Sequence, residues 1–274
     1  MIRRRLKNYL FLSLMTFSGF AVLVPLVLIV SYVIKMGASS FSWTFLTHLP
    51  TPVGESGGGM AHAILGTLYL VGLGGLLAIP LGIILGTYLS EVGKGWMARF
   101  LRHAIDLLTG IPSIVIGIFA YILVVVPLKH FSALSGGIAL GIIILPIVTR
   151  TTEEILKLVS NITREAGLAL GLNQVQVIWH ILIKGNRAGI FTGVVLAISR
   201  AAGETAPLLF TAFGNSYFSH SLMEPMASLP AQIYTYATSP FEEWQAQAWA
   251  GSFVLILIVL GLNLSTRFFM RQKS

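Results

Sequence analysis

Two residues of opposite charge stand four positions apart in an otherwise apolar part of this chain. Arg200 and Glu204 lie within the run 188–213, which is long and apolar enough to cross a membrane. A charge near the middle of a bilayer costs at least about 2.5–3.5 kcal/mol, and such residues normally face a bundle interior or a wet cavity. Residues four apart share one face of a helix, so we expect the two side chains to lie close together.

This pair has two interpretations. In the first, Arg200 and Glu204 form an internal ion pair that serves only packing. In the second, Arg200 is the cationic group of an anion pathway and Glu204 partly masks it. A guanidinium suits a tetrahedral oxyanion because its planar fork donates two parallel charge-assisted hydrogen bonds. The sequence alone leaves both interpretations open.

Gly203 and Pro207 flank the charged pair. Pro207 has no N–H to donate to the carbonyl of Gly203, so we expect the helix to bend there. Membrane helices tolerate proline. The bend is therefore either a simple kink or a hinge in a moving helix.

A second arginine, Arg150, closes the apolar run 134–149 and is followed by Glu153 and Glu154. A long basic side chain near the end of a span can reach the membrane interface. Arg150 is therefore either a topology anchor or the inner end of an anion path. Asp106, near the start of the run 104–128, is expected to pair with one of these arginines.

Soluble-type catalytic chemistry finds no support in the sequence. The chain has no Gly-x-x-x-x-Gly-Lys-Ser/Thr loop, so we expect it not to bind ATP in that way. Its six histidines lack metal-site spacing, and the absence of cysteine excludes disulfides and thiolate ligands. The sequence predicts neither an enzyme nor a cofactor.

Membrane helices must position these residues. The chain has 274 residues, of which 55% are hydrophobic and 10% charged, and its mean hydropathy is +0.83. A soluble domain carries about 25% charged residues, so this composition is typical of a protein embedded in lipid. The candidate spans, each near the roughly 20 apolar residues that a bilayer requires, are about 10–34, 64–90, 104–128, 134–149, 188–213 and 247–269. The predicted fold class is an all-α, polytopic membrane protein with six transmembrane helices.

Lysine and arginine are distributed unevenly over the connections. They gather in the N-terminal tail, after the second span, in the segment 150–187 and in the C-terminal tail, whereas the alternate connections contain only Lys35 and Lys129. By the positive-inside rule we expect both termini and the 150–187 segment to be cytoplasmic. Because the basic residues lie beside apolar runs, the net charge of +8 indicates membrane topology and not nucleic-acid binding.

The cytoplasmic connection 151–187 carries helix signals of its own. Thr163 is predicted to cap a short helix with Glu165 in its first turn, where the helix dipole favours a negative charge. Gly171 can end that helix in the left-handed conformation. Asn173 can then cap a second helix over 174–183. The sequence therefore predicts two short helices that meet at a glycine corner on the membrane surface.

The spacing of Glu165-Ala166, Gly171 and Ile181-Leu182-Ile183 resembles the EAA loop of ABC-importer permeases. In that family the loop is the coupling helix that docks into a cytoplasmic ATPase. The resemblance implies a type I ABC-importer permease fold and a coupling role for Glu165-Ala166 and Gly171. Two positions depart from the pattern, since Gly167 stands at the second alanine and Lys184 at a frequent proline.

Three further stretches look like the PstA-type permeases of phosphate ABC importers: 106–115 (DLLTGIPSIV), 200–209 (RAAGETAPLL) and 226–234 (MASLPAQIY). The resemblance covers nearly the whole chain from about residue 60. It implies transport of inorganic phosphate across a bacterial cytoplasmic (inner) membrane, with Arg150, Arg200 and Glu204 on the path. The partners it implies are a PstC-type second permease, two PstB-type ATPase subunits and a PstS-type phosphate-binding protein.

Two alternatives stay open. The transported anion could be another oxyanion, such as molybdate or sulfate. A secondary anion transporter could also have six spans and a buried Arg–Glu pair, but it would not need an ATPase-docking loop. We expect residues 1–63 to form a tail, the first span and an outer loop, residues 64–269 the permease domain, and residues 270–274 a C-terminal tail. The outer segment 214–246 is expected to be a re-entrant cap or an amphipathic surface segment.

Overall fold

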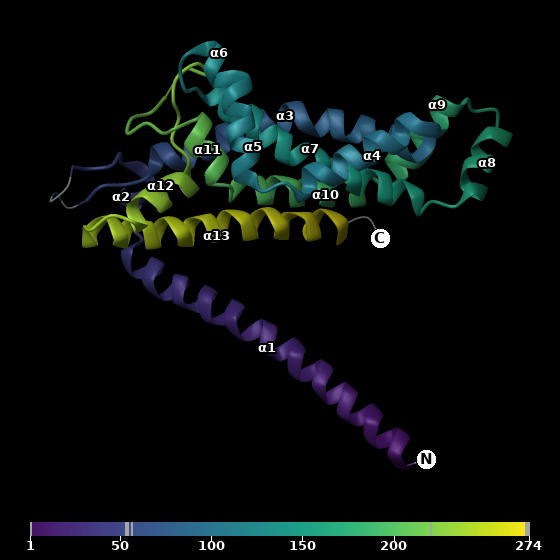
Figure 1. The fold of residues 1–274 in the computed structure, drawn as a ribbon, viewed down its shortest axis with the longest axis horizontal. Helices are drawn as coiled ribbons and strands as arrows, with labels where there is room; N and C mark the ends of the chain where they lie inside the picture. The colour runs from purple at the N-terminus through teal and green to yellow at the C-terminus, as the bar shows by residue number, and fades with distance from the viewer. Residues whose placement is uncertain (1, 53–54, 56, 220, 272–274) are drawn as a thin grey trace.

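The structure is a computed structural model that describes residues 2–52, 55, 57–219 and 221–271. Within these ranges every regular element is a helix, so the all-α expectation is confirmed for the described part of the chain (Figure 1). In chain order the elements are α1 (Ile2–Ser40), α2 (Trp43–Thr47), α3 (Ala61–Glu91), α4 (Gly95–Gly110), α5 (Ser113–Ala120), η1 (Tyr121–Val125), α6 (Val126–Leu128), α7 (Ala133–Lys157), α8 (Asn161–Ala169), α9 (Gln174–Gln176), η2 (Val177–Ile183), α10 (Arg187–Ala202), α11 (Ala206–Thr211), α12 (Leu229–Ala237) and α13 (Glu242–Arg271).

By length and composition, four helices can cross a membrane: Arg3–Ser40, Ala61–Glu91, Ala133–Lys157 and Glu242–Ser265. Two bent pairs raise the number to six if each counts as one span. They are Gly95–Gly110 with Ser113–Leu128 and Gln174–Ile183 with Arg187–Ala202. Four of the six predicted runs thus correspond to uninterrupted helices. The run 104–128 falls within the first bent pair, and the run 188–213 begins in the second bent pair and continues past Ala202.

The run 104–128 is not one continuous helix. α4 and the segment Ser113–Leu128 meet at 107°, and Ile111 and Pro112 form the corner. Ile111 is extended, with φ −71° and ψ 132°, which is the conformation that a following proline favours. Pro112 also lacks the N–H that a continuous helix needs. After the corner, α5 packs against α7 and α11.

The run 188–213 is interrupted as well, so the expectation of a bent but continuous helix is wrong. α10 ends at Ala202, and α11 begins at Ala206 with Pro207 in its first turn. Proline fits the first turn of a helix because its missing N–H has no intrahelical acceptor there. Pro207 therefore starts a new helix, and residues 203–205 form the break.

α7 lies at the centre of the bundle and extends beyond the predicted 134–149 to Lys157. α3 lies along it so closely that a Cβ on Gly74 would stand 2.8 Å from the carbonyl oxygen of Gly137. A Cβ on Gly86 would stand 2.5 Å from the oxygen of Thr149. Small residues permit this approach between membrane helices. Gly74 and Gly86 of α3 thus let α3 and α7 lie close together.

α1 diverges from the bundle. Its C-terminal part packs on α13, where the rings of Tyr32 and Trp249 meet edge to face at 5.2 Å. Figure 1 shows the remainder of α1 running away from the other helices, and the N-terminal end of α1, the C-terminal end of α13 and α8 all lie toward the same side of the molecule. The side chains of residues 3–29 are exposed in this chain.

The segment 214–246, which the sequence predicts to be an outer connection, contains α12, and α12 folds back on the bundle. Leu229 and Tyr236 are buried, and the ring of Tyr236 stacks on Trp244 at 4.6 Å. The backbone N–H of Leu229 donates to Thr67 Oγ1 of α3 at 2.7 Å. α12 is therefore joined to both α3 and α13.

Candidate functional site

The Arg200–Glu204 pair lies where the two helix breaks meet. Arg200 Nε stands 3.8 Å from Glu204 Oε1. Glu204 follows the end of α10, so the pair crosses the break and does not lie along one continuous helix. The exposed fraction of the side chain is 52% for Arg200 and 14% for Glu204. Much of the guanidinium therefore remains accessible in this chain although its partner carboxylate is largely buried.

A narrow crevice connects the pair with the other break. It is lined by Arg200 and Glu204, by residues around the Pro112 corner and by one face of α7: Leu108, Thr109, Ile111, Ser113, Ile116, Ile143, Pro146 and Ile147. A Cβ on Gly117 of α5 would stand 2.7 Å from Pro207 Cα, so α5 and α11 nearly touch here. The crevice holds about 10 Å³, which is close to the minimum for one water molecule. In this state it is too small for a tetrahedral anion.

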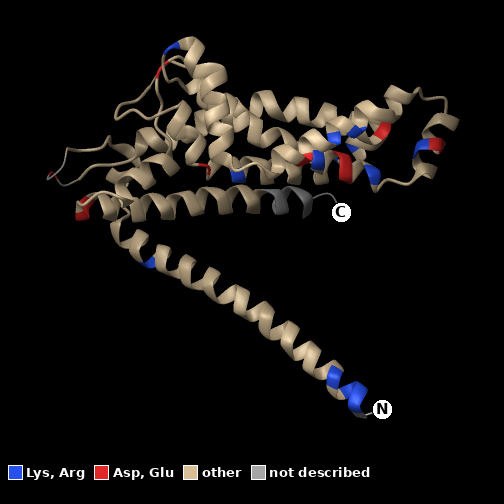
Figure 2. Cartoon of the chain, in the orientation of Figure 1, with Lys and Arg blue, Asp and Glu red and all other residues tan. Residues whose placement is uncertain are grey.

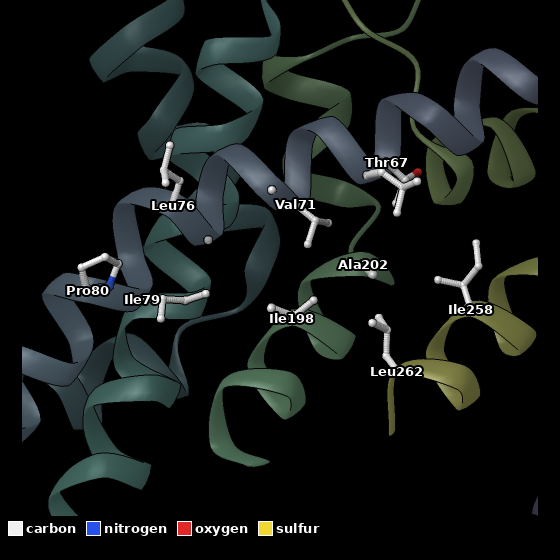
Figure 3. A pocket seen from close by; sticks show the side chains of 12 residues that line it. Thr67, Val71, Leu76, Ile79, Pro80, Ile198, Ala202, Ile258 and Leu262 are labelled. Carbon is white, nitrogen blue, oxygen red and sulfur yellow. The ribbon is translucent and has the colours of Figure 1, made fainter. Parts of the chain in front are cut away.

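A larger groove lies on a different face of α10 (Figure 3). It has a volume of about 480 Å³, and side chains of α3, α10 and α13, among them Val71, Ile198 and Leu262, face it. Its lining is apolar except for Thr67, whose hydroxyl donates to the Ala63 carbonyl. An apolar lining offers nothing to a charged substrate, so the small crevice is the better candidate for an anion path despite its size.

Arg150 is neutralised by carboxylates within the chain. Its guanidinium contacts Asp106 at 2.8 Å, Glu153 at 3.2 Å and Glu154 at 3.7 Å. The expected pairing of Asp106 with an arginine is therefore confirmed. The Arg150 side chain is 38% exposed. Its partners favour the anchoring interpretation over a substrate-binding role, because an arriving anion would compete with three carboxylates.

Glu153 joins α4 to α7 at the end of the bundle that carries α8. Its side chain is 1% exposed and accepts from Arg102 Nε and Lys157 Nζ, each at 2.6 Å. Arg102 also donates to the carbonyl oxygen of Leu89 at the end of α3. A buried carboxylate normally needs such partners, since an unpaired buried charge is strongly destabilising.

The loop 151–187 contains two short helices that meet at a glycine corner, as predicted, but the first helix has a different N-cap residue. Ser160 and not Thr163 caps α8, by accepting from the backbone N–H of Thr163. Glu165 consequently lies in the second turn. Gly171 has φ +85°, so the left-handed corner is confirmed. Asn173 caps the second helix through a reciprocal bond pair with Gln176, also as predicted.

Gly167 and Lys184, which depart from the EAA pattern, both have structural consequences. Gly167 is buried, and a Cβ there would stand 2.6 Å from Ile181 Cδ1 and 3.0 Å from Val177 Cγ2. The glycine therefore lets α8 pack closely on η2. Lys184 ends η2, and its backbone N–H donates to the carbonyl of Ile181, a bond that proline could not make.

Glu165 and Ala166 lie on the exposed side of α8. Within the described part of the chain, no ion pair or side-chain hydrogen bond involves Glu165. Leu168 and Leu170 are also exposed. The surface thus combines an unpaired carboxylate with apolar side chains, which is a composition suited to a protein partner.

Arg164 is a residue of this loop whose role the sequence analysis missed. Its guanidinium forms two hydrogen bonds of 2.8 Å with Glu91, the last residue of α3. It also donates to the carbonyl oxygens of Leu156 and Val159 beside the end of α7. The bonds with Glu91 raise the pKa of the Arg164 guanidinium. The available signal was Glu91 itself, an acidic residue directly after the apolar run 64–90.

Most basic residues are concentrated at two places, as Figure 2 shows. Lysine, arginine and acidic residues gather at the end of the bundle that carries α8, and a basic cluster marks the N-terminal end of α1. The long middle part of the bundle is nearly free of charge. This distribution fits a chain whose central part lies in lipid.

Comparisons with known proteins agree with this description. The family model described as "Binding-protein-dependent transport system inner membrane component" matches residues 78–272. Phosphate transport system permease protein PstA of Haemophilus influenzae is 43% identical over 272 residues, which are 99% of this chain and 96% of that protein. PstA of Pasteurella multocida is 44% identical over 273 residues, covering 99% and 97%. The probable PstA of Methanocaldococcus jannaschii is 33% identical over 270 residues, covering 98% and 95%.

Solved structures of similar fold are also ABC transporters. An inward-facing MetNI methionine ABC transporter matches with a TM-score of 0.66 at 14% identity, over 78% of this chain and 96% of that chain. An amino acid ABC transporter crystallised with histidines matches with a TM-score of 0.58 at 14% identity, over 78% and 93%. The fold is that of an ABC-importer permease, as expected. Within this class, the chain belongs to the binding-protein-dependent transport system inner membrane component family, as a PstA-type member.

Proposed function

We propose that this chain is the permease subunit of an ATP-driven importer that carries inorganic phosphate across the cytoplasmic membrane. The chain itself is not an enzyme, since its relatives are permeases and ATP hydrolysis belongs to a separate subunit. The observation that carries the proposal is the exposed surface of α8. It presents Glu165 at the charged end of a helix bundle whose curated relatives are phosphate permeases.

The ATPase contact is assigned to the loop that contains Glu165, Ala166 and Gly171. The unpaired Glu165 carboxylate can accept from a basic group of the partner, and the exposed Leu168 and Leu170 supply apolar area. The Gly171 corner fixes the angle between α8 and the following helix. With α8 on the cytoplasmic side, both termini are cytoplasmic too.

The anion path is assigned to Arg200 and Glu204, with Gly203 and Pro207 at the break that lets them face the crevice. Arg150, the second candidate arginine, is instead assigned to an anchor at the end of α7, because Asp106, Glu153 and Glu154 already neutralise it. Because the crevice in this chain is too small for phosphate, a second, PstC-type permease supplies the other wall. PstB-type ATPase subunits and a PstS-type binding protein complete the importer.

Uptake of radiolabelled phosphate by cells that lack other phosphate importers tests this proposal. Cells that make this chain with its neighbouring transport subunits are expected to take up phosphate, and cells without this chain are not. Excess sulfate or molybdate should leave uptake unchanged. Phosphate uptake that does not require this chain, or uptake displaced by sulfate or molybdate, would overturn the proposal and support another oxyanion.

A further inference from the structure

One arginine of the surface loop connects three helices. Arg164 of α8 binds Glu91 at the end of α3 through two parallel bonds of 2.8 Å. It also donates to the oxygens of Leu156 and Val159 at the end of α7. The exposed fraction of the side chain is 7% for Glu91 and 20% for Arg164. Bidentate arginine–carboxylate pairs fix orientation as well as distance, so α8 has little freedom to turn relative to α3.

A second connection continues from α3 into the bundle. Arg102 of α4 donates to the oxygen of Leu89, two residues before Glu91, and to Glu153 of α7. The inner ends of α3, α4, α7 and α8 are therefore joined by charge-assisted hydrogen bonds. Two of these helices lead to the crevice, since Leu108 of α4 and Pro146 of α7 line it together with Arg200.

We infer that the Glu91–Arg164 pair couples the ATPase-docking loop to the helices that line the anion path. Glu91 is a positioning residue: it touches neither phosphate nor the ATPase, and it holds α8 so that a displacement of the loop moves the ends of α3 and α7. The inference rests on the proposed coupling role of the loop. Among the residues that the structure describes, Arg164 makes the side-chain hydrogen bonds that join α8 directly to α3 and α7, whereas the apolar contact of α8 is with η2.

The test uses the assembled importer in proteoliposomes and measures phosphate transported per ATP hydrolysed. Glu91→Gln keeps the shape of the side chain and removes its charge. We expect assembly and ATP hydrolysis to persist while phosphate moved per ATP falls about fivefold or more, the lower range of energetic coupling between sites. Glu154→Gln is the matched control, because this carboxylate belongs to the same end of the bundle but is 69% exposed and contacts Arg150 only at 3.7 Å.

A reversible tether separates a mechanical role from a role in folding. The native chain has no cysteine, so Glu91→Cys with Arg164→Cys can be joined by a short thiosulfonate cross-linker that reductant releases. Cross-linking the two cysteines should restore the amount of phosphate transported per ATP hydrolysed, and cleaving the cross-link with reductant should lower that amount again. Each single cysteine variant, treated in the same way, should show no restoration.

Several outcomes would overturn the inference. The first is that Glu91→Gln transports as much phosphate per ATP as wild type. The second is that Glu154→Gln lowers this ratio as much as Glu91→Gln does. The third is that assembly or transport is lost in the double cysteine variant and the tether does not restore it. The wild-type importer is measured alongside. If it does not couple ATP hydrolysis to phosphate movement, the proposed function fails and not merely the role of Glu91.

Discussion

At the scale of single residues, the accessibility of Arg200 decides between an ion pair and an anion-binding group. A purely structural pair would be expected to close at hydrogen-bond distance and to be buried on both sides. Instead the contact is 3.8 Å long, and the arginine is half exposed while the glutamate is largely buried. The guanidinium therefore retains donors for another acceptor.

Neutralising both members of this pair should separate the two interpretations. We expect the double variant Arg200→Gln/Glu204→Gln to assemble, because no lone buried charge remains. We expect its phosphate uptake to fall roughly tenfold to a hundredfold, the equivalent of the roughly 1.5–3 kcal/mol of a hydrogen bond to a charged group. Uptake is read beside the amount of assembled complex in cells without other phosphate importers.

Arg187→Gln serves as the control for this variant. Arg187 begins α10, the helix that carries Arg200, and is exposed. The variant Arg187→Gln should leave phosphate uptake within about twofold of wild type, as expected for a change at an exposed residue. If the double variant transports phosphate normally, Arg200 and Glu204 are a structural pair only.

At the scale of elements, the left-handed corner at Gly171 defines the shape of the ATPase-docking loop. No atom stands within 4 Å of the position that a Cβ would occupy there, so only the backbone conformation opposes a larger residue. We expect Gly171→Val to cost at least about 1–2 kcal/mol locally, because L residues avoid this conformation. Uptake should fall further than in Glu165→Ala, with the chain still inserted in the membrane.

Gly185→Val is the matched control for the corner. Gly185 belongs to the same loop, also has open space at its Cβ position and lacks a positive φ. Both variants are compared by uptake and by the amount of ATPase that co-purifies. Equal effects of Gly171→Val and Gly185→Val would refute the corner as the cause.

The sequence predicts most helices of this fold and misses the breaks between them. Hydropathy locates the runs because lipid requires apolar side chains, but it contains no information on continuity. Pro112 and Pro207 are both evident in the sequence, but a proline in a membrane helix can also form a simple kink, and only the bounds of α5 and α11 show that a new helix begins at each. The same limit holds for the site. Arg200 and Glu204 were found by their charge, whereas the Glu91–Arg164 pair joins residues 73 positions apart, which no local pattern can predict.

At the scale of the whole molecule, the uneven charge predicts one orientation in the membrane. α8, the N-terminal end of α1 and the C-terminal end of α13 lie toward the same side of the molecule (Figure 1), and the positive-inside rule predicts that this side is cytoplasmic. We expect Ser216→Cys in the outer segment to react with an impermeant thiol reagent in intact cells. Asn161→Cys at the start of α8 should react only after the cells are opened.

Ser216 and Asn161 are both exposed in this chain, so a difference in labelling does not come from burial within the protein. The native chain, which contains no cysteine, provides the background. Labelling of Asn161→Cys in intact cells would show the opposite orientation and would contradict the assignment of the ATPase-docking loop.

The central claim is that phosphate moves through this chain when ATP is hydrolysed on the α8 side. The most direct measurement is phosphate accumulation by proteoliposomes that contain the purified importer with α8 facing the lumen, binding protein outside and ATP enclosed. The account predicts accumulation with ATP, none with a non-hydrolysable analogue, and a loss in Gly171→Val. Accumulation that continues without ATP would contradict it and would indicate a secondary anion transporter.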